Sequence, residues 1–302
     1  GAAAAPAANP GDKKAAEDYK KKVEEVTKKN EKIKADNEAM NNALEAGKGL
    51  FNAKNYAGAI AEFDKGIAID QEQHVFWYFK GLSQFNKGVT ELNESIKDPS
   101  QRDPAKQDFT DAVANATKAV AVLDASVAAD PTKQAAAKPT RVGYLKVKAD
   151  AASLLGRRFS DQAMAESSNK DYLACAEMSD DPAKKRDFAF KGAETLREAG
   201  MTDPAVAAYQ AILATDPNFT DCYYGMGIAY AGNEKTFQDA ANYLQLFVDK
   251  APNDPRAGEA KQVIDALKVG NNIKPSKEAM KILQKDAGGG AEKGKPAPKK
   301  KP

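Results

Sequence analysis

The sequence predicts an all-α protein in which helix pairs stack one after another into a solenoid. Gly47 and Gly81 are 34 residues apart at equivalent places in a helical pattern, and Gly192 and Gly227 repeat nearly the same spacing farther along. Arrays of helix pairs have periods of this length, because each pair buries its apolar face against its neighbours. The chain is 42% hydrophobic and rich in alanine, a strong helix former, so its composition fits close-packed helices.

The first repeat is expected over residues 40–73, as two helices joined by a turn at Asn55–Tyr56. Gly47 lies where the two helices should come close together. Apolar residues spaced three and four apart mark the facing sides of the two helices, and they include Phe51, Ala59 and Phe63.

The second repeat is expected over residues 74–126 and contains an insertion. Its first helix carries Trp77 and Gly81 and is expected to end near Phe85–Asn86. Residues 88–106 are rich in Asp, Pro, Ser and Gln, which predicts an inserted loop. The second helix then resumes with alanines and Phe109 at helical spacing.

Three more units and a cap follow. Residues 185–219 and 220–254 repeat the pattern around Gly192 and Gly227, whereas residues 139–184 predict two helices with a weaker pattern, a divergent third repeat. Residues 255–268 predict a single helix with one apolar face, as the open end of a repeat array requires. A short terminal helix is expected over residues 269–285.

The repeats resemble the tetratricopeptide repeat, whose signature is W-x2-L-G-x2-Y, then A-x3-F, then P. The fifth unit matches it best, with Tyr223, Gly227, Tyr230, Ala240 and Pro252 in register. The resemblance covers residues 40–268. It implies a solenoid of about five helix pairs with a C-terminal capping helix, preceded here by a long charged N-terminal helix.

The resemblance also implies that the first helix of each unit lines a concave groove that binds a protein or peptide. Family members that grip a C-terminal carboxylate use Lys and Asn where this chain has Leu44 and Lys48, so a chaperone-tail receptor is not expected. The groove instead suits a peptide with apolar anchors and an acidic group. The expected groove residues are Asn41, Lys48, Phe51, Asn52, Tyr78, Leu82, Phe85, Asn86, Arg186, Arg197 and Tyr224.

Residues 13–39 predict a charged helix with an apolar stripe that repeats every seven residues. Two interpretations remain open: the stripe lies on the first repeat, or it pairs with another molecule as a coiled coil. Lys22 and Lys29 would face Thr27 and Lys34 in a parallel pair, which offers no attraction and one repulsion. The residues of this possible self-assembly arm are Tyr19, Val23, Val26, Asn30, Ile33 and Asn37.

The two ends have low-complexity sequences. Residues 1–12 are rich in Ala and Pro, and a start of this kind fits an exported chain, periplasmic or extracellular, with a cytoplasmic chain as the alternative. Residues 286–302 are rich in Gly, Pro and Lys and predict a disordered basic tail. Sequons occur at Asn93, Asn115 and Asn218, at a number that chance accounts for.

The side chains that catalysis requires are scarce. His74 is the single histidine, and Cys175 and Cys222 lie a whole repeat apart, outside any C-x-x-C pattern. We therefore expect a non-enzymatic protein without cofactor or metal. A net charge of +2 argues against a dedicated nucleic-acid surface, and apolar runs are too short to predict a membrane span.

Two functions remain at this point. The first is a scaffold that binds a protein or peptide in its concave groove, which the family resemblance implies. The second is a structural subunit that assembles with itself through head-to-tail contacts of the solenoid ends and the arm. Contacts of that kind give filaments when they do not close into a ring.

Overall fold

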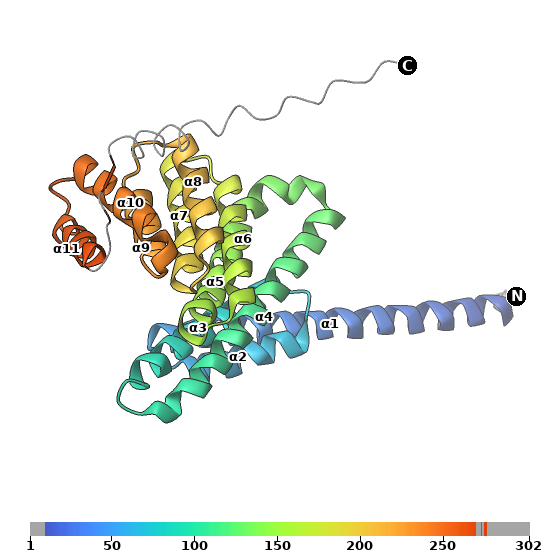
Figure 1. The fold of residues 1–302 in the computed structure, drawn as a ribbon. Coiled ribbons are helices and arrows are strands. Elements are labelled where there is room, and N and C mark those ends of the chain that lie inside the picture. Colours follow the sequence, from blue (N-terminus) through green and yellow to red (C-terminus); the bar gives the residue numbers. More distant parts are fainter. Residues whose placement is uncertain (1–9, 270–272, 274, 277–302) are drawn as a thin grey trace, which may run out of the picture.

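The computed structural model describes residues 10–269, 273, 275 and 276, and every regular element among them is helical (Figure 1). Short 3₁₀ turns at Pro99–Gln101, Pro131–Lys133 and Glu234–Thr236 precede three of the helices. The α-helices are α1 (Pro10–Asn52), α2 (Tyr56–Ile69), α3 (His74–Glu94), α4 (Arg102–Ala129), α5 (Gln134–Phe159), α6 (Gln162–Met178), α7 (Pro182–Glu198), α8 (Thr202–Thr215), α9 (Asp221–Tyr230), α10 (Phe237–Lys250) and α11 (Ala257–Lys268).

The helices stack as five antiparallel pairs with α11 as a cap. Each helix packs against the next one along the chain, and the first helix of a pair also contacts the first helices of neighbouring pairs, as α7 does with α5 and α9. This arrangement confirms the predicted all-α solenoid of five helix pairs and a capping helix. The predicted terminal helix at residues 269–285 lies mostly outside the described residues.

Short polar side chains set the starts of several helices. The Asn55 side chain accepts a hydrogen bond from the backbone N–H of Gly58 at 3.0 Å, and the Asp181 side chain accepts one from Ala183 at 2.9 Å. Such caps satisfy N–H groups that a helix leaves free at its start. Pro182 occupies the first turn of α7, where its missing N–H costs nothing, so the fourth unit begins three residues earlier than the predicted Lys185.

Two repeat glycines allow close helix contacts. A Cβ atom on Gly47 would lie 2.4 Å from Cε1 of Phe63, and one on Gly227 would lie 2.6 Å from Cγ of Leu244. Real Cβ atoms do not approach other atoms so closely, so each glycine permits the packing of its own helix pair. Gly49, one half-turn from Gly47, has open space around it.

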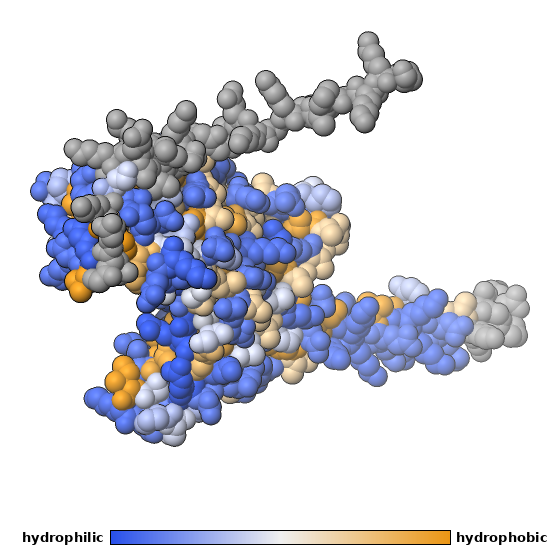
Figure 2. Space-filling view, in the orientation of Figure 1, coloured by the Kyte–Doolittle hydropathy of each residue, from blue (hydrophilic) through white to orange (hydrophobic). Residues whose placement is uncertain are grey.

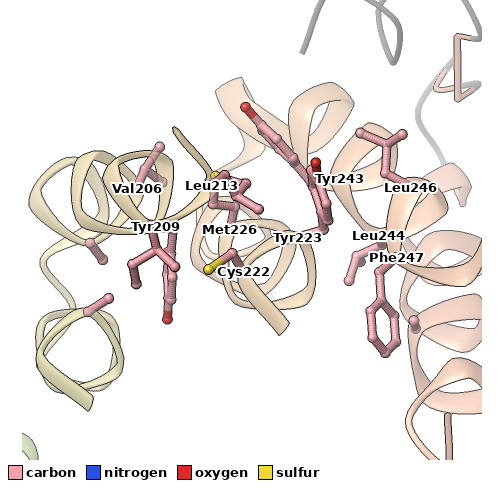
Figure 3. Close-up of a cluster of buried hydrophobic side chains, with 14 of the residues drawn as sticks. Val206, Tyr209, Leu213, Cys222, Tyr223, Met226, Tyr243, Leu244, Leu246 and Phe247 are labelled. Carbon is pink, nitrogen blue, oxygen red and sulfur yellow. The ribbon is translucent and has the colours of Figure 1, made fainter. Parts of the chain in front are cut away.

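The largest buried cluster lies in the last helix pairs, between α7 and α11 (Figure 3). Tyr209, Tyr223 and Phe247 are almost completely buried there, together with Met226 and Leu244. Full burial of one such side chain stabilises the fold by about 1.5–3 kcal/mol. A smaller cluster around Phe63 and Phe76 fills the first units.

The insertion in the second repeat is mostly helical, so the predicted loop at residues 88–106 is wrong. Helix α3 continues to Glu94 and α4 begins at Arg102. Side-chain contacts hold the two extended ends together: Lys87 Nζ lies 2.7 Å from Glu91 Oε1 and 2.6 Å from Asp108 Oδ2, and Gly88 packs on the ring of Phe109. The composition of this segment predicted a loop, but these contacts between α3 and α4 stabilise helical structure on both sides of the connection.

Residues Pro99–Ala129, which comprise α4 and the turn before it, form a helical segment long and apolar enough to cross a membrane by length and composition alone. Four of its alanines, Ala105, Ala112, Ala116 and Ala119, are fully buried, and α4 contacts both α3 and α5, whereas Ala114, Ala121 and Ala125 are exposed. The apolar character of α4 thus serves the contacts between helix pairs.

Candidate functional site

The residues predicted to line the concave groove do not form one open surface. Asn41 and Asn52 are exposed, whereas the aromatic members pack on other rings. Phe51 packs against Tyr56, and the other pairs are Tyr78 with Tyr144, Phe85 with Phe109, and Tyr224 with Phe247. These contacts are between helices of the solenoid, so much of the predicted apolar lining contributes to its core.

The charged and polar members of that set also have partners within the chain. Lys48 pairs with Glu45 at 3.1 Å, and Arg197 Nε donates to Glu194 Oε1 at 3.2 Å. The Asn86 amide donates to the Leu82 carbonyl oxygen at 2.8 Å. As a recognition site the concave groove remains a prediction.

A groove of about 1050 Å³ lies between α6 and α8 with α7 as its floor, and Arg186 is the member of the predicted set that lines it. We call it the outer groove, because the second helices of two successive pairs form its walls. Its lining is Glu166, Asn169, Leu173, Ala176, Glu177, Pro182, Ala183, Lys185, Arg186, Ala189, Leu196, Pro204, Ala207, Ala208, Ala211, Ile212, Thr215 and Asp216. Of these 18 side chains, 11 are apolar, and six of the 11 are alanine.

The alanines of the outer groove determine which ligands fit into it. Ala207 and Ala211 are exposed on α8, and Ala176 and Ala189 line the facing wall and the floor. Small side chains let another backbone approach closely, and packed helices lie about 8–10 Å apart, the shorter distance being reached with small residues. Leu173 is 42% exposed in the same groove and offers an apolar contact.

Polar atoms in the groove are incompletely paired. Oδ1 of Asn169 is buried and has no hydrogen-bond partner, and the same is true of Nε of Arg186. The rest of the Arg186 guanidinium is held by Asp216 and Asp187, at 3.3 Å each, and lies 4.5 Å from the ring centroid of Phe219. The Asn169 oxygen packs against Gly192, where an added Cβ atom would lie 2.3 Å from it, so it is enclosed between α6 and α7 and does not face a ligand.

The edges of the outer groove carry acidic side chains. Glu166 and Glu177 are both exposed on α6, 11 residues apart, and within the described part of the chain neither forms an ion pair. Lys185 lies at the end of the groove near Arg186. The α6 edge therefore presents two free carboxylates, which suit a partner with basic groups beside an apolar face.

A second surface is the arm, which we define as residues 17–39 of α1. Helix α1 runs without a break from the arm into the first repeat and carries the arm away from the solenoid (Figure 1). Tyr19, Val23, Val26 and Ile33 are 71%, 45%, 56% and 47% exposed. The interpretation that this stripe lies on the first repeat is therefore wrong, because a straight continuous helix cannot fold back onto its own repeat.

The arm is hydrophilic over most of its surface, with isolated hydrophobic side chains along it (Figure 2). Its sequence explains how it stays helical without a neighbour. Glu17, Asp18, Glu24 and Glu25 each precede a lysine by four residues. Acid-to-lysine pairs at this spacing and in this direction each stabilise a helix by about 0.2–0.5 kcal/mol.

The two cysteines and the histidine lie in environments that shift their pKa values. Burial raises the pKa of the Cys175 thiol to about 11 and also raises that of Cys222, so both stay protonated at neutral pH. The two cysteines are free and buried. Burial lowers the pKa of His74, whose Nδ1 lies 2.7 Å from the hydroxyl of Tyr144. Among the described residues, no group of His, Cys, Asp and Glu side chains could hold a metal ion.

The sequence contained a signal for the outer groove that the repeat pattern concealed. In the second helix of the fourth unit, Ala207, Ala208 and Ala211 take positions where a solvent-facing helix side would carry charged residues. An alanine face on an otherwise charged chain indicates a surface that another backbone can approach.

No family model and no curated protein sequence matches this chain. Solved structures with a related fold include the crystal structure of the MamA protein, with a TM-score of 0.47, 15% identity and coverage of 73% of this chain and 96% of that one. Another is YrrB, described as a TPR protein with an unusual peptide-binding site, with a TM-score of 0.41, 17% identity and coverage of 73% and 90%. The helix pairs and their period make this chain a tetratricopeptide-like solenoid.

Proposed function

We propose that the chain is a non-enzymatic scaffold that binds a helical segment of another protein in the outer groove. The observation that carries the proposal is the groove itself, about 1050 Å³ in volume, walled by two helices and lined by 11 apolar side chains, six of which are alanine. Helix α7, which forms the floor, lies between α6 and α8 in the sequence. The groove that these three helices form has room for one more helix.

The choice of ligand follows from the lining. An apolar helix face fits against the alanines of the outer groove, and basic side chains meet Glu166 and Glu177. Helix-in-groove recognition reads anchors at i, i+3, i+4 and i+7 on one face of the bound helix. The concave groove offers less, since its aromatic residues already pack within the solenoid.

The test is selection of helical peptides from a displayed library against the full chain. Selected peptides should bind through an apolar face with flanking basic residues. Their affinity should fall at least about tenfold, or 1.4 kcal/mol, for Ala211→Trp, which places a large side chain in the groove without touching the core. The matched control is Asn52→Trp in the concave groove, which should leave their affinity unchanged.

Circular dichroism of both variants should match the wild type, since both sites are exposed. If Asn52→Trp abolishes peptide binding and Ala211→Trp does not, the concave groove is the binding site and the proposal is wrong. Selection that yields no specific helical peptide also contradicts it.

A further inference from the structure

We propose that the helix that occupies the outer groove is the arm of a second copy of this chain, so that the protein assembles head to tail. This inference rests on the proposed function and names its partner. The first evidence for it is the distribution of exposed apolar side chains. The described part of the chain has eight large ones, of which four (Tyr19, Val23, Val26 and Ile33) lie on the arm and a fifth, Leu173, lies in the outer groove.

Apolar side chains that gather on one face of a helix and stay in water indicate an interaction surface. On the arm they form a stripe at helical spacing, with Asn30 and Asn37 in the same row. Single exposed apolar residues need no explanation, but a row over several turns does. The stripe therefore favours a partner surface for the arm.

The charges beside the stripe select the kind of partner. Lys22, Lys29 and Lys34 lie next to it, whereas Lys20, Asp18, Asp36 and Glu38 all lie slightly farther around the helix. Two arms packed stripe to stripe would bring these lysines together, which disfavours the coiled coil considered from the sequence. A surface with carboxylates along its edges is favoured instead.

The outer groove is such a surface. Glu166 and Glu177 lie exposed on its α6 edge, and among the described residues neither forms an ion pair.

The arm cannot reach the groove of its own molecule. Helix α1 is continuous from Pro10 to Asn52, where it packs in the first repeat, so the arm is fixed in direction (Figure 1). The 30 residues from 10 to 39 extend about 45 Å, which is long enough to cross to a neighbouring molecule. The arm and the outer groove are different surfaces, so each molecule can place its arm in the groove of one neighbour and accept the arm of another neighbour in its own groove. Such contacts can continue into a chain of molecules.

The test is exchange of charges between the two surfaces, read by sedimentation velocity of the full chain over a range of concentrations. Lys22→Glu with Lys29→Glu, and separately Glu166→Lys with Glu177→Lys, should each weaken association at least about tenfold. A mixture of the two variants should restore association, because the reversed arm then fits the reversed groove. The control is Lys21→Glu with Lys28→Glu, which makes the same charge change on the opposite side of the arm and should leave association unchanged.

A cross-link locates the contact. Chains carrying Val26→Cys, mixed with chains carrying Ala211→Cys, should give a dimer with a short bismaleimide, whereas Lys28→Cys with Ala211→Cys should not. The buried native cysteines, with raised thiol pKa values, react slowly. A chain that stays monomeric at all concentrations overturns the inference, and so does association that survives both charge reversals. If selected peptides still bind the groove in either case, the proposed function stands and only the second copy is excluded.

Discussion

The arm of α1 and the helix pairs from α7 to α11 use the same kind of helix in opposite ways. In the helix pairs, large side chains such as Tyr209 and Phe247 are fully buried and each helix depends on its neighbours. In the arm, Tyr19 and Val26 are mostly exposed and the spacing of acids and lysines supports the helix. Helix content alone therefore does not show which helices contribute most to the stability of this protein.

The largest difference is expected between matched truncations in the two regions. Phe247→Ala should lower the free energy of unfolding by about 3–5 kcal/mol, because it leaves a cavity in the main core. Val26→Ala should change it by less than about 0.5 kcal/mol, since the side chain is exposed and alanine is the better helix former. Urea unfolding at low protein concentration measures both, and equal losses would remove the distinction between the regions.

The next effect concerns two glycines in the part of α1 that packs in the first repeat. Gly47→Leu should destabilise the first repeat by about 1–3 kcal/mol or more, because a side chain there collides with Phe63. Gly49→Ala, two residues away, has open space and should stabilise the helix by up to about 1 kcal/mol. Thermal melts followed by circular dichroism compare them. A Gly47→Leu protein with the wild-type melt would refute the predicted repeat register.

A smaller effect is expected from pH, at the contact between α3 and α4. Burial raises the pKa of Asp108 to about 6, although Lys87 beside it acts in the opposite direction. The folded chain therefore binds a proton that the unfolded chain, with an ordinary carboxyl pKa, does not bind between about pH 4 and 6. The Asp108 carboxyl therefore raises the free energy of unfolding by on the order of 1 kcal/mol as the pH falls from 7 to 5.

The measurement is the urea midpoint at pH 5 and pH 7 for the wild type and for Asp108→Asn. His74 and other groups titrate in both proteins, so the difference between the two pH dependences isolates Asp108. The rise in stability toward pH 5 should be smaller in the variant. An unchanged pH dependence would show that Asp108 keeps an ordinary pKa.

The solenoid could be predicted from the sequence because its signals are local and repeated. Gly47 and Gly227 recur with the period of a helix pair, and both lie in close contacts in the structure. The helical insertion could not be predicted, because the contact of Lys87 with Asp108 joins residues 21 positions apart. Composition around Pro99 indicated a loop, and only residues 95–101 form the connection between α3 and α4.

The candidate site was harder to predict for a different physical reason. Phe85 and Tyr78 satisfy the family pattern of a concave lining, yet whether such a ring faces a groove or a neighbouring helix depends on packing between units. The outer groove depends on how far α6 and α8 stand apart, which no single repeat encodes. The exposed stripe of the arm was visible in the sequence, but its separation from the first repeat was not.

The most direct test of the account is the particle mass of the full chain and of a chain that lacks residues 1–38, measured by sedimentation velocity over a hundredfold range of concentration. The account predicts that the full chain assembles as concentration rises, that the shortened chain stays monomeric, and that both unfold with the same free energy when dilute. Equal assembly of the two chains, or a monomeric full chain throughout, would contradict it.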